Sequence, residues 1–266
     1  MLHALAWGLL PPLLLATATW VASLPLRDAS LADRIWSLMI ALPGVAYALL
    51  LAPHAGAQDR ITWMLVLVGA WALRLAAYVT WRNRGHGEDR RYAAMRAEHG
   101  ASFALRSLFT VFLLQAVLAW IVSWPLLAGA ASTRELGLLD WLGAAVAAFG
   151  IVFEAVGDAQ LARFRADPSN RGQVMQHGLW RYSRHPNYFG EACIWWGLGA
   201  MALAGGGLTA AWTLASPLLM TVLLLRVSGV TLLEKDITER RPAYRDYIRR
   251  TSAFVPMPPR RTGDAA

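Results

Sequence analysis

The chain consists of long apolar stretches separated by shorter polar segments. Seven stretches can be drawn, covering residues 3–24, 32–52, 61–81, 107–128, 137–157, 187–205 and 208–230. Each is close to the roughly 20 residues that a helix needs to cross a hydrocarbon core of about 30 Å. They lack the polar residues that recur every three to four positions on the exposed face of a surface helix. The pattern therefore predicts an all-α, polytopic membrane bundle of about seven transmembrane helices.

Composition strengthens this prediction and excludes several other classes of protein. Hydrophobic residues make up 56% of the chain and charged residues only 16%, against roughly 25% charged in a soluble domain. Cys193 is the only cysteine, which excludes a disulfide scaffold and a cysteine-ligated zinc site, and we expect no metal. The apolar fraction and the 13 tryptophans exclude intrinsic disorder. We expect a single integral membrane domain over residues 1–266.

The basic residues predict the orientation in the membrane. If the N-terminus lies outside, 22 of the 25 lysines and arginines fall in the inner segments 25–34, 82–106, 158–186 and 226–266. Arg60 and Arg134 fall in outer connectors, and Arg74 falls inside a span. Because cytoplasmic loops collect basic residues, the C-terminus and the working face are predicted to be cytoplasmic, in a multi-pass protein of the cell inner membrane. This topology explains the net charge of +8 without nucleic acid as a partner, and no obligate protein partner is inferred.

Five ionisable residues lie at or inside the predicted spans. They are Asp33, Arg74, Glu154, Asp158 and Glu191. Facing lipid, each would cost about 2.5–3.5 kcal/mol near the bilayer centre, so we expect them to face the bundle interior or a polar cavity. Glu154 and Asp158 share one helix face, where two like charges need a common partner, such as the arginines that follow or the donors of a ligand. The alternative is that these residues pair structurally across helices.

The segment after the fifth span has a composition typical of nucleotide binding. Arg163, Arg165, Arg171, Arg181 and Arg184 fall within 22 residues, interleaved with aromatic rings. Arginine binds phosphate bidentately, and aromatic faces stack on planar rings. Pro186 is suited to the first turn of the sixth span, whose N-terminus also favours an anion. The pattern predicts a ligand with phosphates and a flat ring; the alternative is a basic interfacial loop placed only by topology.

The same segment carries a family resemblance. The run from Leu179 to Glu191, LWRYSRHPNYFGE, resembles the signature of the steroid 5-alpha-reductase-like membrane family and is similar to its bacterial branch of unknown function. Agreement extends over about residues 30–258. It includes Asp158–Leu161 with Phe164 and Asn170, Trp81–Glu88, and Tyr244–Tyr247 with Ser252, Phe254 and Pro256. The wider superfamily also holds sterol reductases and isoprenylcysteine carboxyl methyltransferases.

The resemblance implies a seven-span reductase that holds NADPH and reduces a carbon–carbon double bond conjugated to a carbonyl. It implies cofactor contacts from Asp158, Asn170, Arg171, Arg181, Arg184, His185, Asn187, Tyr188 and Glu191, with Glu234, Tyr244 and Tyr247 closing the site. The arginine, aromatic and polar pattern of the segment adds Arg163, Trp180, Tyr182 and Ser183.

The substrate end of the site departs from the family pattern. The reductases' carbonyl-polarising tyrosine aligns with Trp71, and their glutamate either aligns with Asp33 or has no counterpart. A tryptophan N–H donates a hydrogen bond but supplies no proton. We therefore take Asp33, Arg74 and Tyr78 as catalytic candidates acting on a lipophilic, steroid- or isoprenoid-like substrate that enters from the bilayer.

Two other functions stay open. One is an S-adenosylmethionine-dependent methyltransferase on the same scaffold. The other is a non-catalytic transporter or lipid-binding module. The arginine cluster favours NADPH, because S-adenosylmethionine is a cation without phosphate.

Overall fold

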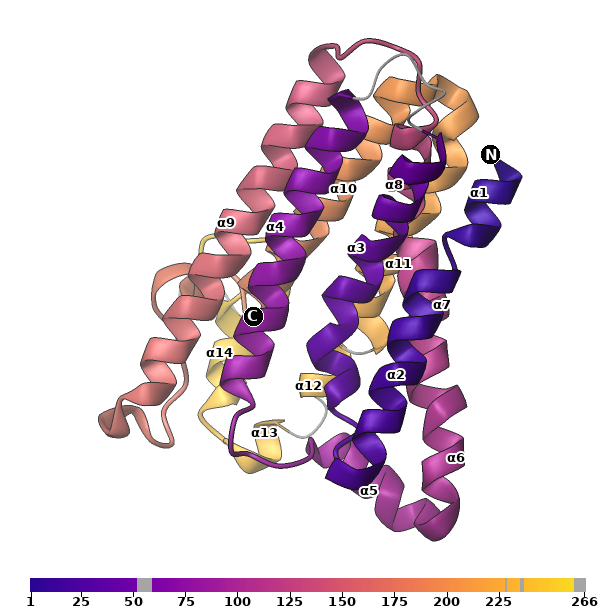
Figure 1. The fold of residues 1–266 in the computed structure, drawn as a ribbon. Helices are drawn as coiled ribbons and strands as arrows, with labels where there is room; N and C mark the ends of the chain where they lie inside the picture. The colour runs from indigo at the N-terminus through magenta and orange to yellow at the C-terminus, as the bar shows by residue number, and fades with distance from the viewer. Residues whose placement is uncertain (52–58, 228, 235–236, 261–266) are drawn as a thin grey trace. The chain divides into compact units, whose positions relative to one another are not determined.

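The structure is a computed structural model that describes residues 1–51, 59–227, 229–234 and 237–260 (Figure 1). These residues form helices and connecting loops, with an isolated parallel bridge between Ser183 and Ser252. The α-helices are α1 (Leu2–Trp7), α2 (Leu10–Leu26), α3 (Leu31–Leu51), α4 (Asp59–Arg82), α5 (Arg90–His99), α6 (Phe103–Ser107), α7 (Leu114–Val122), α8 (Trp124–Ala130), α9 (Leu138–Ala166), α10 (Pro186–Gly206), α11 (Ala215–Val222), α12 (Val230–Glu234), α13 (Ile237–Arg240) and α14 (Tyr244–Arg250). The predicted all-α membrane bundle is confirmed.

Within the described residues, six helical segments are long and apolar enough to cross a membrane. They are Leu2–Leu26, Leu31–Leu51, Asp59–Arg82, Arg90–Val122, Leu138–Ala166 and Pro186–Glu239. The first five correspond to the first five predicted spans. The last one contains both remaining predicted spans, 187–205 and 208–230.

The sixth segment folds back on itself, so these two predicted spans are consecutive helices. Trp196 Nε1 of α10 donates to Thr221 Oγ1 of α11 over 3.2 Å, although 25 residues of straight helix would separate them by roughly 37 Å. The reversal follows Gly207, whose φ of +59° suits a residue without Cβ. The glycines at positions 205–207, between the last two predicted spans, therefore lie where α10 ends.

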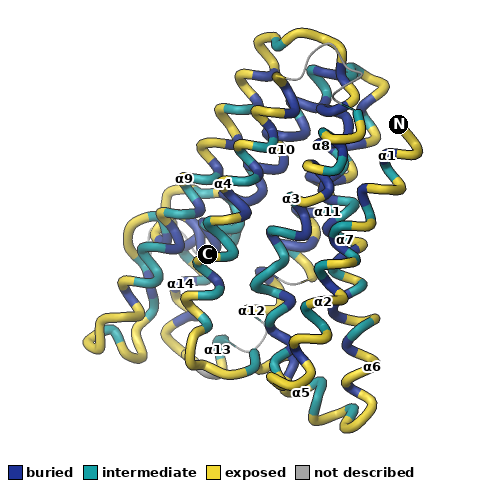
Figure 2. Tube along the Cα trace, viewed as in Figure 1, coloured by how far each residue is buried: buried dark blue, intermediate teal, exposed yellow. Residues whose placement is uncertain are grey.

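Contacts along the chain divide it into two compact units. The first unit is Met1–Ala144 with Leu198–Ser216, and the second is Ala145–Gly197 with Pro217–Ala266. In the first unit, α3 packs against α2, α4, α7 and α8. Met39, Tyr47 and Trp71 are fully buried in its core; Figure 2 shows the buried positions of the chain in dark blue. Apolar side chains such as Val66 and Phe109 are more than half exposed, as is expected of helices that face lipid.

Arg60 occupies a buried polar site in the first unit. The sequence placed it at the end of the outer connector 53–60, of which residues 53–58 lie outside the described residues; in the structure Arg60 lies in the first turn of α4 and its side chain is fully buried. Its Nε and Nη2 donate to Asp140 Oδ1 and Oδ2 over 2.7 and 2.9 Å. The remaining donors reach Ser132 Oγ and the carbonyls of Arg134 and Glu135. All five N–H groups of this guanidinium are therefore hydrogen-bonded.

A second polar junction fixes the turn between α2 and α3. Glu88 Oε1 accepts from the Ala29 backbone N–H over 2.8 Å, and Arg96 donates to both Glu88 oxygens over 2.7 and 2.9 Å. The Arg96 hydrogen bond holds the pKa of Glu88 below its usual range. The junction therefore positions the start of α3, which carries Asp33.

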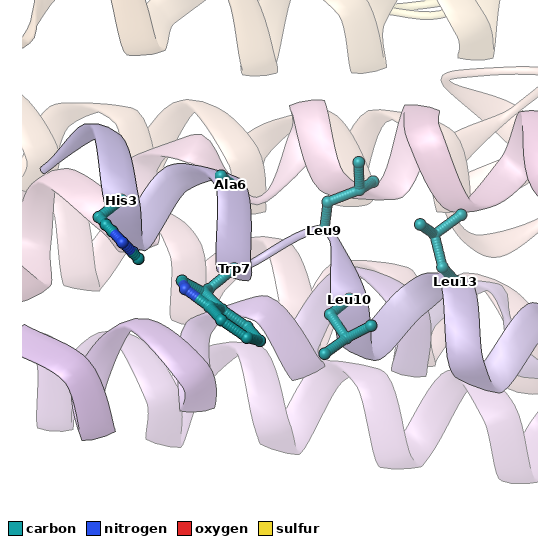
Figure 3. Close-up of a pocket in the computed structure, with 6 residues that line it drawn as sticks. All are labelled: His3, Ala6, Trp7, Leu9, Leu10 and Leu13. Carbon is teal, nitrogen blue, oxygen red and sulfur yellow. The ribbon is translucent and has the colours of Figure 1, made fainter.

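A shallow hollow lies along α1 and the start of α2 (Figure 3). Its lining is mainly apolar, from Ala6, Trp7, Leu9, Leu10 and Leu13, with the His3 imidazole at one end. The His3 and Trp7 rings are stacked, with centroids 6.4 Å apart. This chemistry suits an aliphatic chain rather than a phosphate, so the candidate site lies elsewhere.

Candidate functional site

In the second unit, α9 and α10 approach each other at two glycines. A Cβ on Gly190 would lie 2.7 Å from both the Gly150 carbonyl oxygen and the Glu154 backbone nitrogen. A Cβ on Gly150 would in turn lie 2.5 Å from the Gly190 carbonyl oxygen. Real side chains do not tolerate such distances to backbone, so only glycine permits this approach. The contact places Glu154 of α9 beside the turn of α10 that carries Glu191.

The predicted carboxylates lie inside this helix pair and not on its lipid face. Glu154, Asp158 and Glu191 are 2%, 4% and 7% exposed. Asn187 Nδ2, in the first turn of α10, donates to Asp158 Oδ1 over 3.2 Å. Pro186 begins α10, as predicted. The structure therefore brings together Asp158, Asn187 and Glu191, which the sequence separates by up to 33 positions.

The loop after α9 folds back onto the helix end. The Trp180 Nε1–H donates to the Gly157 carbonyl over 3.0 Å, and the Gln160 Oε1 accepts from the Leu179 backbone N–H over 2.8 Å. Phe164 and Met175 bury the Trp180 ring, and Asn170 Nδ2 donates to the Phe164 carbonyl over 3.1 Å. The predicted contacts Trp180 and Asn170 therefore shape the loop itself.

Arg184 forms a buried ion pair with the chain after the last span. Its Nε and Nη2 donate to Glu234 Oε1 and Oε2 over 2.7 and 2.9 Å, and Nη1 donates to the carbonyls of Ile248 and Thr251. His185 Nε2 lies 3.0 Å from Glu234 Oε1. The Arg184 guanidinium group is therefore bound to Glu234 in this structure. Its predicted contact with a phosphate stays a prediction.

The C-terminal segment holds the motif loop through its backbone. The Arg184 backbone N–H donates to the Ser252 carbonyl over 2.9 Å, and Ser183 Oγ donates to the Phe254 carbonyl over 2.8 Å. Tyr247 Oη donates to the Trp180 carbonyl. Tyr244 and Tyr247 are both buried, and burial raises the pKa of Tyr247. This neutral phenol therefore serves as a structural donor.

Some of the other predicted cofactor residues remain accessible, whereas His185 is buried. Arg163, Arg171 and Arg181 are exposed, and none forms an ion pair with a carboxylate among residues 1–51, 59–227, 229–234 and 237–260. Tyr182 is 42% exposed. The His185 and Tyr188 rings stack at 5.3 Å with an interplanar angle of 5°. The unit therefore combines accessible cations with aligned aromatic rings.

Asp33 in the first unit lies in a polar cluster. Tyr92 Oη donates to Asp33 Oδ1 over 2.7 Å, and Arg91 Nη2 donates to Asp33 Oδ2 over 2.6 Å. Gln115 Nε2 lies 3.4 Å from Asp33 Oδ1 and 3.3 Å from Tyr92 Oη. Sequence reasoning missed Tyr92 and Gln115. The available signal was Gln115, an amide inside an otherwise apolar stretch of span four.

The other two catalytic candidates lie on α4. Arg74 and Tyr78 are one turn apart and partly buried. The Tyr78 ring lies 6.0 Å from Trp81, and the Arg82 guanidinium lies 5.8 Å from the Tyr78 centroid. All three catalytic candidates belong to the first unit, and all predicted cofactor residues belong to the second.

Comparison with known proteins adds a family match. Residues 19–251 match the family described as "Protein of unknown function (DUF1295)". An uncharacterized protein of Schizosaccharomyces pombe is 25% identical over 275 residues, covering 94% of this chain and 78% of the relative. No solved structure matches.

Proposed function

Because the chain belongs to this family of unknown function, DUF1295, we propose a function from its motif and geometry. The protein is an NADPH-dependent membrane reductase that reduces a carbon–carbon double bond conjugated to a carbonyl in a lipophilic, steroid- or isoprenoid-like substrate. The resemblance of Leu179–Glu191 to steroid 5-alpha-reductase-like enzymes supports this proposal. The distribution of basic residues supports a cytoplasmic working face in the cell inner membrane.

The observation that carries the proposal is a difference between the arginines: one is paired with a carboxylate, and three exposed ones are not. Arg184 is buried against Glu234, whereas the exposed Arg163, Arg171 and Arg181 have no carboxylate partner within the described part of the chain. Such accessible forks suit bidentate binding of phosphate. Several phosphates, including the 2′-phosphate of NADPH, fit this donor set better than a phosphate-free cation such as S-adenosylmethionine does.

The second unit would orient the cofactor. Glu191 and Asp158, held inside the α9–α10 pair, can accept hydrogen bonds from a carboxamide, and Asn187 fixes Asp158. The outer face of the Tyr188 ring, which stacks on His185, suits a planar ring. Bound NADPH would supply the hydride for the double bond.

The Asp33 cluster of the first unit is the proposed polar group for the substrate. Reduction places negative charge on the carbonyl oxygen and requires a proton at the neighbouring carbon. Tyr92 carries a phenolic proton, and Asp33 and Gln115 orient that hydroxyl. Tyr92 therefore joins Asp33, Arg74 and Tyr78 as a candidate at the substrate end.

Nucleotide titration tests the proposal. Tryptophan fluorescence of the detergent-purified chain should be quenched by NADPH at lower concentration than by NADH. Arg181→Gln should weaken NADPH binding about tenfold, as expected for one charge-assisted contact, with Arg106→Gln, an exposed change in the first unit, as control. Equal affinity for the two nucleotides would refute the arginine argument, and binding of S-adenosylmethionine alone would favour the methyltransferase.

Two carboxylate variants separate the two groups of residues. Glu191→Gln should impair NADPH binding without unfolding the protein, whereas Asp33→Asn should lower turnover of an enone substrate with NADPH affinity unchanged. The reverse result would contradict this division of roles. If neither variant changes anything, the carboxylates are structural.

Reporter fusions test the orientation. A reporter after Ala266 should be cytoplasmic and one inserted near Gly206 should lie outside. Protease access to the C-terminus in intact cells would contradict it.

A further inference from the structure

Helix α14 presents arginines on the side opposite its buried tyrosines. Tyr244 and Tyr247 are 9% and 2% exposed, whereas Arg245 and Arg249, one turn apart, are exposed. The Arg249 side chain is 70% exposed. Neither the proposed cofactor contacts nor the packing of the unit uses these two guanidinium groups.

The chain after α14 is held through its backbone to the motif loop and to the end of that helix. The Met257 backbone N–H donates to the Tyr182 carbonyl over 2.9 Å, and the Arg260 backbone N–H donates to the Arg250 carbonyl over 2.9 Å. Val255 and Met257 are nevertheless 46% and 54% exposed. The segment therefore combines a fixed backbone with accessible apolar and cationic side chains. We refer to Arg245, Arg249, Val255, Met257 and Arg260 as the C-terminal surface.

The charge of this surface is positive and weakly compensated. Asp246 is the acidic residue of α14, and it pairs with Arg249 while its side chain is 61% exposed. Such solvent-exposed pairs contribute little and exchange readily with another anion. Guanidinium groups bind phosphate oxygens bidentately, and aliphatic side chains beside cations are typical of segments that lie in a membrane interface.

The bilayer is within reach of the C-terminal surface. The fifth predicted span ends at residue 157, where the Gly157 carbonyl accepts from Trp180 Nε1, and Tyr247 of α14 donates to the Trp180 carbonyl. We propose that the C-terminal surface binds the headgroups of anionic phospholipids in the membrane that the protein spans. The arginines contact the phosphates, and Val255 and Met257 enter the interface.

This proposal gives the arginines a specific role beyond topology. The positive-inside rule requires basic residues on one side of the membrane but sets no arrangement for them. If the arginines served only topology, any equal loss of exposed basic charge would affect lipid selection equally. If they form a lipid site, lipid selection should fall only when basic charge is removed from the C-terminal surface. Charge-matched variants therefore distinguish the two.

The test uses the full chain purified in a neutral detergent. Retention of dioleoyl-phosphatidylglycerol is compared with that of dioleoyl-phosphatidylcholine by native mass spectrometry and by thermal stabilisation on lipid titration. The variant replaces Arg245, Arg249 and Arg260 by Gln, and the control replaces the exposed Arg84, Arg90 and Arg106 by Gln. A third variant replaces the same C-terminal arginines by Lys.

The wild type should prefer the anionic lipid. Each arginine near an anionic surface contributes roughly fivefold in affinity, so the Gln variant should lose on the order of a hundredfold, while the control and the Lys variant keep most of the preference. Absence of a preference in the wild type, or equal losses in the Gln variant and the control, would overturn the proposal. Loss of NADPH binding with lipid preference intact would assign these arginines to the cofactor instead.

The proposal remains testable if the Gln variant fails to fold. In that case the single change Arg245→Gln and the salt dependence of the wild type decide the question, because a lipid-phosphate contact weakens as ionic strength rises. A preference for phosphatidylglycerol that changes neither with Arg245→Gln nor with added salt would also overturn the proposal.

Discussion

Replacing Arg60 by methionine should strongly destabilise the first unit. Methionine approximates the length and the apolar stem of arginine, so the change removes mainly the guanidinium. Asp140, which is 2% exposed, would then keep a buried negative charge without its bidentate partner. The Ser132 hydroxyl and the carbonyls of Arg134 and Glu135 would lose a donor as well.

The magnitude follows from this geometry. Two of the five hydrogen bonds join Arg60 to the Asp140 carboxylate. Breaking a buried ion pair by removing one partner costs about 3–5 kcal/mol, because the other charge stays buried and uncompensated. For a chain of this size the corresponding fall in melting temperature is roughly 10 °C. Neutralising the remaining charge in Arg60→Met/Asp140→Asn should recover part of this loss.

The assay is thermal unfolding in detergent, followed by size-exclusion chromatography of the heated samples. Arg134→Met is the matched control, since that side chain is exposed and the Arg134 carbonyl is what binds Arg60. We expect Arg134→Met to melt close to the wild type. The reasoning would be refuted if Arg60→Met melted within about 2 °C of the wild type. It would also be refuted if the double variant were less stable than Arg60→Met alone.

Three further predictions concern the helix contact and the C-terminal segment. Gly190→Ala should lower thermal stability by about 1–3 kcal/mol, because its Cβ meets backbone at 2.7 Å, whereas Gly69→Ala, with nothing within 4 Å, should be neutral or stabilising. Glu234→Gln should accelerate proteolysis of the C-terminal segment in a time course, because the buried Arg184 loses its carboxylate partner; an unchanged cleavage rate would contradict this. Because burial raises the pKa of Tyr247 in the folded protein, its contribution to stability is complete below the ordinary tyrosine pKa of about 10 and falls as the pH rises above it. Melting temperatures from pH 7 to 11 should therefore fall less steeply for Tyr247→Phe, which loses about 1 kcal/mol at neutral pH, and parallel curves would contradict the assignment.

The spans could be predicted because hydropathy is a local property of the sequence. Any helix of about 20 apolar residues is driven into the bilayer whatever its neighbours are. Pro186 marked the start of α10 for an equally local reason, since a first turn does not need its N–H. The cost of exposing charge to lipid also predicted that Glu154, Asp158 and Glu191 would be buried, and they are.

Pairing between distant residues was decided only by the tertiary structure. Arg60 looked like a connector residue, yet its partner Asp140 lies 80 positions further along the chain. Arg184 belongs to an arginine cluster that suits phosphates, but its fork binds Glu234, 50 positions away. A guanidinium binds any carboxylate within reach, so the partner depends on which helices meet. The sequence alone therefore determined which segments enter the membrane and which side chains cannot face lipid, whereas the packing of the helices selected the partner of each buried charge.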